Sequence, residues 1–260
     1  MRSLAIAATG MLAQQLNVEV ISNNIANINT TAFKRQRAEF QDLLYQNERR
    51  VGSTSSDSGT IVPAGVQIGV GVKAAAVYRI TEQGNMLKTD NSLDVAIQGK
   101  GFFQVRLPDG TNAYTRAGSF QLSPTGEIVT ADGLIVQPGI TIPPDATAVT
   151  INASGQVQVQ PPTGQPQNVG TLELANFANE AGLENLGDNL LRETPASGTP
   201  QQGAPGATGF GKLLQGFLET SNVNVVSEIT NLITAQRAYE MNSKVIQASD
   251  EMARTLSNYH

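Results

Sequence analysis

The chain of 260 residues has no cysteine and no tryptophan, and its one histidine is His260. Without cysteine it can form neither a disulfide nor a thiolate metal site. A lone histidine at the last position is poorly placed for a metal cluster or a catalytic triad, because both need several converging groups. We therefore predict no metal site, no catalytic residues and no cofactor.

Charge is also scarce: Asp, Glu, Lys and Arg make up 15% of the chain, and the net charge is -5. Binding to a phosphate backbone needs a concentrated basic patch. The densest basic stretch runs from Lys34 to Arg50, but Glu39, Asp42 and Glu48 stand between its cations. This mixture is typical of a solvated face, and it predicts no nucleic-acid partner.

No uninterrupted apolar run approaches the ~18 residues that span a bilayer, which predicts no membrane insertion. The N-terminal "MRSLAIAATGMLA" nevertheless resembles a secretory signal. Its apolar periodicity continues past Gln14 and Gln15 as far as Ile25. A cleaved signal has no reason to share a helical face with the mature chain. We therefore predict a retained helix, with a cleaved signal as the alternative.

Two amphipathic patterns lie at opposite ends of the chain, one over about the first 25 residues and one over 225–257, which has no Gly or Pro. Apolar residues recur at spacings of three, four and seven, as in a coiled-coil seam, and the polar Gln236, Ser243 and Asp250 fall on the second seam. We predict that the two helices pair and that their remaining apolar surface packs against other copies. The predicted helix-packing residues are Leu4, Ala8, Met11, Val18, Ile25, Val225, Ile229, Leu232, Tyr239, Ile246 and Ala253.

Between the helices the pattern becomes that of short β-strands. "VQIGVGVKAAAVYRI" (66–80) alternates, and "LDVAIQGKGFFQV" (93–105) is typical of a strand, a glycine turn and a second strand. Hairpin signals follow at Asp109-Gly110 and Asp132-Gly133. We predict an α+β fold, in which the terminal helices pair as a coiled-coil-like layer and a mainly antiparallel β region is inserted between them.

Two polar segments, 51–65 and 193–211, have the composition of flexible connectors. We predict three parts on this basis. The first is a terminal helical polymerisation domain (1–30 and 222–260). The second is an intermediate connector and β domain (31–94 and 187–221), and the third is an outer all-β domain (95–186).

Two glycine motifs could indicate nucleotides. "GATGFGKL" (206–213) nearly matches a phosphate-binding loop, but Leu213 stands where a hydroxyl is needed and no strand precedes it. "QGKGFFQV" (98–105) has no third glycine and no following helix, so a turn between strands is the simpler interpretation. The spaced carboxylate pairs 90/94 and 180/184 have no sign of a desolvated pocket. We predict that the protein is not an enzyme.

Three stretches together resemble the flagellar basal-body rod and hook family over essentially the whole chain. "NNIANINTTAFKRQRAEF" (23–40) is similar to its N-terminal signature A-N-x-N-T-x-G-F-K, "VAIQGKGFFQV" (95–105) to its β-domain signature, and 216–252 to its C-terminal helix. Total length and the run 42–73, with a loop around 46–65, are most similar to the distal-rod members. The motif at 23–34 comprises Asn23, Asn24, Ala26, Asn27, Asn29, Thr30, Ala32, Phe33 and Lys34. The C-terminal motif comprises Ser221, Asn222, Val223, Gln236, Arg237, Ala238, Tyr239 and Glu240.

The resemblance implies a structural subunit of the distal rod, which assembles with other copies into a helical tube and transmits torque through the periplasm. The terminal helices would form the inner layer and the β region the outer one. It also implies export through the flagellar type III apparatus without signal cleavage. Implied partners are proximal rod subunits, hook subunits or the hook junction, and the L- and P-ring bushing proteins.

The asparagine-rich stretch 23–30 follows the first helix, so we interpret it as a helix exit that joins the helix to the next domain. Ala32 stands where the family signature has glycine. We predict a negative φ at Ala32, because alanine tolerates that conformation without strain.

Alternative functions remain open from sequence alone. The polar β region could be a carbohydrate- or cell-wall-binding module, although exposed aromatic residues for a sugar platform are few. A hook-type axial subunit is a second alternative, and a nucleotide-dependent enzyme based on "GATGFGKL" is a third.

Overall fold

The computed structural model describes residues 2–49 and 65–258, so residues 51–64 of the first predicted connector and His260 lie outside the described residues. The chain divides into two compact units. The helix unit comprises Met1–Ala26, Gln36–Arg79 and Asn224–His260, and the β unit comprises Asn27–Arg35 and Ile80–Val223. Each unit is therefore discontinuous in sequence. This grouping does not test the predicted three-part division, which stays a prediction.

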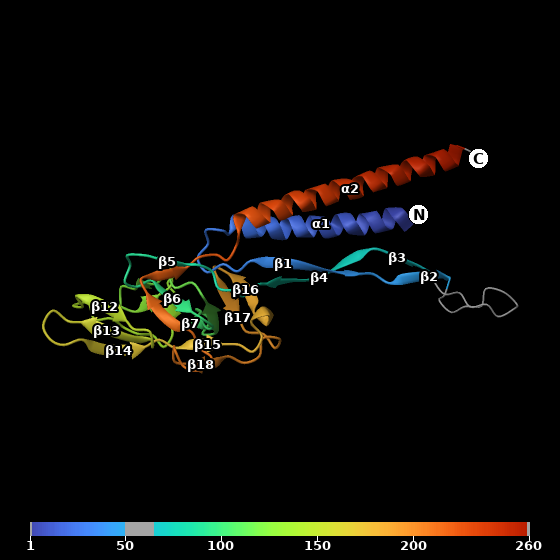
Figure 1. The fold of residues 1–260 in the computed structure, drawn as a ribbon. Helices are drawn as coiled ribbons and strands as arrows, with labels where there is room; N and C mark the ends of the chain where they lie inside the picture. The colour runs from blue at the N-terminus through green and yellow to red at the C-terminus, as the bar shows by residue number, and fades with distance from the viewer. Residues whose placement is uncertain (1, 50–64, 259–260) are drawn as a thin grey trace. The chain divides into compact units, whose positions relative to one another are not determined.

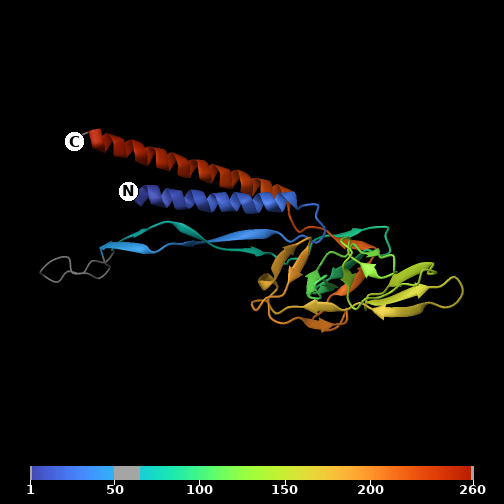
Figure 2. The ribbon, with the colours of Figure 1, turned by 180° about the vertical axis from the view of Figure 1, so that it is seen from behind.

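The helix unit contains two long helices, α1 (Arg2–Ala26) and α2 (Val225–Asn258), which run antiparallel. α1 lies between α2 and a two-stranded ribbon of β1 (Gln36–Asp42) and β4 (Val72–Arg79), as Figures 1 and 2 show. An isolated two-stranded ribbon is marginally stable in water. α1 contacts both strands of this ribbon, whose residues are half-buried or exposed. A second ribbon pairs β2 (Tyr45–Arg49) with β3 (Val66–Gly69).

Small residues allow α1 to approach both neighbours closely. A Cβ atom at Gly10 would lie 2.9 Å from Nδ2 of Asn242 on α2. On the opposite side Gly71 has a φ of +124°, and a side chain there would clash with Oγ1 of Thr9. The same Thr9 oxygen accepts a hydrogen bond from the backbone N–H of Val72 at 3.3 Å. These contacts fix the position of α1 along both partners.

α1 has the length and mean hydropathy of a helix that could span a membrane. Although polar residues interrupt its apolar runs, α1 is long and apolar enough, by length and composition alone, to cross a membrane. A core helix or a signal sequence meets the same criterion. The prediction based on uninterrupted runs was therefore too strict, and the expectation of no membrane insertion stays a prediction.

The β unit is built from antiparallel pairs. Its nine-stranded sheet has the order β16-β17-β8-β7-β11-β10-β9, with β15 paired to β7 and β18. A three-stranded sheet has the order β12-β13-β14, and two smaller pairs are β6-β19 and β5-β20. The strands are β5 (Met86–Lys88), β6 (Val95–Gln98), β7 (Phe102–Arg106), β8 (Asn112–Thr115), β9 (Gln121–Leu122), β10 (Ile128–Val129), β11 (Ile135–Val136), β12 (Ala148–Ile151), β13 (Gln156–Gln160), β14 (Gln167–Thr171), β15 (Leu174–Asn176), β16 (Glu184–Gly187), β17 (Leu190–Arg192), β18 (Gln201–Gly203), β19 (Lys212–Gln215) and β20 (Phe217–Glu219). A short 3₁₀ helix, η1, covers Glu180–Gly182.

Strand alternation divides the buried side chains of the β unit into two clusters. Phe103 and Val105 of β7 belong to the main core, which also contains Phe120. The neighbouring Phe102 points to the other face, because successive side chains of a strand alternate, and it joins a small cluster with Tyr114 and others. The α+β class with terminal helices around a mainly antiparallel β region is thus confirmed.

The prediction of a flexible connector at 193–211 is wrong. The segment contains β18, which pairs with β15, and its Ser197 is fully buried. Hydrogen bonds within the 194–198 turn explain this order: the Ser197 hydroxyl donates to the carbonyl of Thr194 at 2.8 Å, and the Thr194 N–H donates to Ser197 Oγ at 3.0 Å. Ser, Thr and Pro build turns as readily as linkers, so composition alone did not separate the two.

Candidate functional site

Asn24 is the polar centre of the helix unit. Its side chain, at the C-terminal end of α1, is buried. The carboxamide pairs with the backbone of Gln36 at the start of β1, donating to the carbonyl at 2.8 Å and accepting from the N–H at 2.8 Å. The same Nδ2 donates to Oε2 of Glu228 on α2 at 3.3 Å. One side chain therefore joins α1, β1 and α2, and we call these contacts the Asn24 network.

The start of α2 places Glu228 for this contact. Asn224 caps the helix, because its Oδ1 accepts the N–H of Ser227 at 3.1 Å. Glu228 lies in the first turn, where the partial positive charge of the helix N-terminus favours a carboxylate. This helps a buried acidic side chain to remain in the helix unit.

The β unit begins with a tight turn after α1. The Thr30 N–H donates to the carbonyl of Asn27 at 3.2 Å, and the Thr30 hydroxyl donates to Oδ1 of Asn27 at 3.0 Å. Ala32 follows with a φ of 58°, so the predicted negative φ is wrong. The left-handed conformation directs the Ala32 N–H to the carbonyl of Glu219 at 2.8 Å. The position that the family signature gives to glycine does need positive φ, and here alanine accepts the strain.

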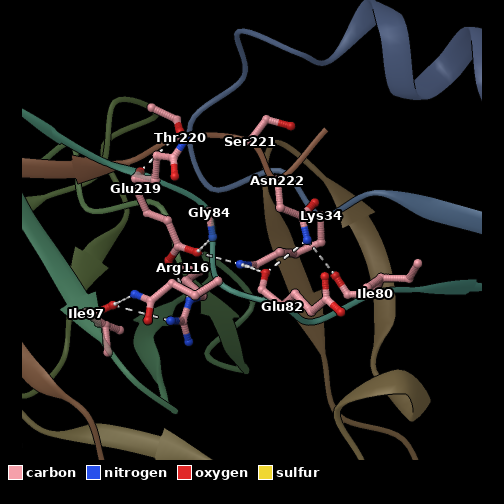
Figure 3. Close-up of polar contacts among 12 residues, drawn as sticks. Lys34, Ile80, Glu82, Gly84, Ile97, Arg116, Glu219, Thr220, Ser221 and Asn222 are labelled. Atoms are coloured by element: carbon pink, nitrogen blue, oxygen red, sulfur yellow. Dashed lines mark hydrogen bonds and ion pairs between the residues drawn. The ribbon is translucent and has the colours of Figure 1, made fainter. Parts of the chain in front are cut away.

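A buried ion cluster, the Glu219 cluster, lies next to this turn (Figure 3). The Glu219 carboxylate receives Nζ of Lys34 at 2.5 Å on one oxygen and Nε of Arg116 at 2.7 Å on the other. The backbone N–H of Gly84 donates to it at 2.9 Å. The Glu219 side chain is 0% exposed, Arg116 9% and Lys34 11%, so water screens the three charges little.

Arg116 connects this cluster to the "QGKG" turn between β6 and β7. Its guanidinium donates to the carbonyls of Gly99 at 2.5 Å, Gly101 at 2.9 Å and Ile97 at 3.3 Å. Gly99 and Gly101 have φ values of +110° and +132°. The prediction of a turn between strands is confirmed, and the turn's carbonyls surround a cation. "GATGFGKL" is also followed by a strand, β19, where a phosphate-binding loop requires a helix.

The pKa directions of the cluster follow from burial and charge. Burial alone would raise the pKa of Glu219, but Arg116 and Lys34, with hydrogen bonds from Lys34 and Gly84, hold it below its ordinary value. Burial lowers the pKa of Lys34 more than the shared Glu219 carboxylate raises it. Two cations share one anion, so ionised Glu219 is the element that keeps the cluster together.

The carboxamide of Asn222 makes a second hydrogen-bond network, the Asn222 network, which lies within the β unit. Its Oδ1 accepts the N–H of Arg35 at 2.7 Å, and its Nδ2 donates to the carbonyls of Ile80 and Glu82, each at 2.9 Å. Lys34 Nζ also donates to the Glu82 carbonyl at 2.9 Å (Figure 3). The segments 33–35, 80–84 and 219–222 are therefore held side by side by polar side chains.

The predicted motif residues separate into two groups. The first group is buried or half-buried and forms or adjoins the Asn24 network, the Asn222 network and the Glu219 cluster. Its members are Asn24, Ala32, Lys34, Ser221 and Asn222. The exposed members of the motifs are Asn23, Ala26, Asn29, Gln236, Arg237, Tyr239 and Glu240, and the other half-buried ones are Asn27, Thr30, Phe33, Val223 and Ala238. Glu219, Arg116, Glu228 and Gln36 were missed, because their contacts join distant segments that no local pattern links.

The helix faces differ from the predicted seam. The buried residues of α1 are Ala7, Ala13, Val20, Ile21 and Asn24, whereas Leu4, Met11, Val18 and Ile25 are half-buried and Ala8 is exposed. On α2 the buried residues are Glu228, Ala235 and Ser249. Leu232, Ile246 and Ala253 are half-buried, and Val225, Ile229 and Tyr239 are exposed.

α2 therefore presents apolar side chains that the single chain leaves uncovered. At its N-terminal end Val225, Val226, Ile229 and Ile233 are all exposed, and Val226 reaches 75%. At helical spacing, the last three lie on the face opposite to the buried Glu228 and Ala235. We call these four residues the α2 apolar patch. Met241, Val245 and Met252 are exposed further along α2. Contiguous exposed apolar surface on a helix is typical of an association surface.

Family models match three regions of the chain. The model "Flagella basal body rod protein" matches residues 4–34, "Flagellar hook protein FlgE/F/G D1 domain" matches 96–159, and "Flagellar basal body rod FlgEFG protein C-terminal" matches 214–258. These regions contain α1 with the turn after it, the first half of the β unit, and β20 with α2. Together the three matches define the class as an axial protein of the bacterial flagellum.

Full-length relatives narrow this class. The chain is 64% identical to the flagellar basal-body rod protein FlgG of Caulobacter vibrioides over 99% of this chain and 98% of the relative. It is 56% identical to FlgG of Agrobacterium fabrum and 40% identical to FlgG of Bacillus subtilis, again over 99% and 98%. The chain belongs to the FlgG family of flagellar basal-body rod proteins, and it is a structural subunit of the distal rod. The alternative of a carbohydrate-binding module is not favoured.

Proposed function

We propose that this subunit polymerises through its terminal helices into a helical tube that acts as the drive shaft between the proximal rod and the hook. The α2 apolar patch carries the proposal, because four exposed aliphatic side chains on the first three turns of α2 would be costly to leave in water. A patch on one copy that meets a different surface on the next copy makes an open contact, which repeats into a filament.

Torque transmission needs subunits that do not deform where polar side chains hold their segments together. The Asn24 network connects both helices to β1 in the helix unit, and the Glu219 cluster connects three segments of the β unit. Multiple short hydrogen bonds between buried charged groups resist local opening more than exposed pairs do. We propose that these networks make each unit mechanically stiff.

The other expectations of the family belong to the same proposal. The rod would cross the periplasm, and its subunits would pass through the flagellar type III export apparatus without signal cleavage. Its partners would be other copies, proximal rod subunits, hook subunits or the hook junction, and the L- and P-ring proteins. We propose no catalysis, no nucleic-acid binding and no membrane insertion, and we retain the coiled-coil-like helix layer and the three-part division for the assembled subunit.

A matched pair of substitutions on α2 tests the assembly proposal. Ile229→Glu places a charge in the α2 apolar patch, whereas Gln247→Glu places the same charge on the exposed polar part of the same helix. Light scattering at increasing concentration should show polymers for Gln247→Glu, as for the unmodified chain, and none for Ile229→Glu. Polymerisation of Ile229→Glu at the unmodified concentration would reject the α2 apolar patch as the assembly surface.

A further inference from the structure

The β unit is completed by a segment near the end of the chain. Residues 212–222, which we call the closing segment, contain β19, β20, Glu219 and Asn222. β19 pairs with β6 in the register Lys212 to Gln98, and β20 pairs with β5 in the register Phe217 to Lys88. Each partner lies more than a hundred residues earlier in the chain. The contacts are therefore among the most non-local of the fold.

β6 depends on the closing segment for its backbone pairing. Val95, Ala96 and Ile97 of β6 are almost completely buried. Among the described residues, β19 is the one strand that pairs with β6. Leu213 of β19 lies in the same core cluster as Val95 and Ile97. The Val95 N–H and the Ile97 carbonyl have other partners, Gly118 and Gln83. Without the closing segment, the backbone groups of β6 that face β19 would lose their strand partners, and a cavity would lie where Leu213 packs.

The cations of the Glu219 cluster show the same dependence. Lys34 and Arg116 precede Glu219 by 185 and 103 residues. Until Glu219 arrives, a closed β unit would hold two largely buried cations without this carboxylate between them. Removal of one partner from a buried ion network is strongly unfavourable, because the remaining charge stays desolvated. Asn222 adds the carboxamide that ties Arg35, Ile80 and Glu82.

We infer that the closing segment is a folding switch: the earlier parts of the β unit, Asn27–Arg35 and residues 80–208, do not form the stable β unit until residues 212–222 join them. The inference stands on strand pairing, burial and charge within the β unit. Its consequence for export rests on the proposed function. If a subunit leaves the export channel with its N-terminus first, its β unit stays unfolded until the closing segment has emerged.

A nicked full-length protein tests the inference. The turn at 207–209 is exposed, so a protease site introduced after Thr208 can be cut in the folded chain. The fragments 1–208 and 209–260 are separated in denaturant, and each is returned to buffer. Amide hydrogen exchange then reports the protection of β6, β7 and β8. The nicked, unseparated protein should retain native protection, whereas 1–208 alone should lose it in all three strands.

Adding the missing piece separates a switch from a general loss of stability. The fragment 209–223, which lacks the whole C-terminal part of the helix unit, should restore native protection to 1–208. The same fragment with Glu219→Gln should bind at least about a hundredfold more weakly. In the longer fragment 209–260, the exposed Glu251→Gln should restore protection as well as the unmodified fragment does.

Two results would overturn the inference. Native protection of β6, β7 and β8 in 1–208 alone would show that the closing segment is dispensable. Failure of 209–223 to restore protection would show that pairing and charge within 212–222 do not control folding. Neither result depends on polymerisation, so the Ile229→Glu test can fail or succeed independently.

Discussion

The substitution Glu219→Gln removes the carboxylate charge of the Glu219 cluster and keeps nearly the same side-chain shape. Lys34 and Arg116 then remain 11% and 9% exposed without their shared anion. Loss of one partner from a buried ion network costs roughly 3–5 kcal/mol. Domain stabilities are on the order of 5–15 kcal/mol, so this single change would remove a large fraction of the stability of the β unit.

A surface pair provides the matched control for this prediction. Glu184 pairs with Arg192 at 2.7 Å, with the two side chains 52% and 51% exposed. Glu184→Gln removes the same charge by the same substitution, and it should cost less than about 1 kcal/mol, because water screens the pair. Both residues belong to the β unit, so the two variants report on the same unfolding transition.

The assay is urea unfolding of the full chain below its polymerisation concentration. Pulsed amide exchange of β6, β7 and β8 follows the β unit separately from the helices. A lower urea midpoint with an unchanged slope is expected for Glu219→Gln. The reasoning would be refuted if the unfolding free energies of Glu219→Gln and Glu184→Gln differed by less than about 1 kcal/mol.

Four further predictions follow from the same contacts. The pKa of Glu219 in the folded protein lies below the ordinary 4.5. Its contribution to the stability of the β unit is therefore complete above that pH and is lost as the pH falls through the folded pKa. The urea midpoint of the β unit should drop in acid, and it should drop less in Glu219→Gln. Ala32→Gly should raise the free energy of unfolding by up to about 1 kcal/mol, because glycine relieves the φ of 58°, whereas Ala32→Val should lower it by about 2 kcal/mol in the same titration. Asn24→Asp should destabilise the helix unit by about 3 kcal/mol, because it places a second carboxylate against Glu228 and the Gln36 carbonyl. The loss of helical circular dichroism in urea measures this, and an unchanged urea midpoint would contradict the role of the Asn24 network. Deletion of 230–260 should leave amide protection of β6 intact while it abolishes light scattering from polymers.

The sequence was sufficient for the features that depend on local periodicity and turn chemistry. Amphipathic patterns predicted both terminal helices, and the second pattern has no Gly or Pro over 225–257. Asp-Gly pairs predicted turns at Gly110 and Gly133, both of which have positive φ. Asn24 was within the motif interpreted as a helix exit, whereas Asn222 was within the C-terminal motif that the family resemblance supplied.

Features that depend on distant segments were not predictable in this way. Glu219 contacts Lys34 and Arg116, which lie 185 and 103 residues earlier in the chain, and no local sequence pattern predicts such contacts. The buried face of α1 is set by α2 on one side and the β1–β4 ribbon on the other, so a two-helix seam identified none of its buried residues and only four of its half-buried ones. Ala32 was wrongly assigned a negative φ, because the tolerance of alanine was given more weight than the turn that its backbone must make.

The most direct test of the account is negative-stain imaging of the concentrated full-length protein, beside Ile229→Glu and Gln247→Glu. The α2 apolar patch predicts tubes for the unmodified chain and for Gln247→Glu, and dispersed particles for Ile229→Glu. Tubes of equal length and abundance in all three samples would contradict assembly through the α2 apolar patch.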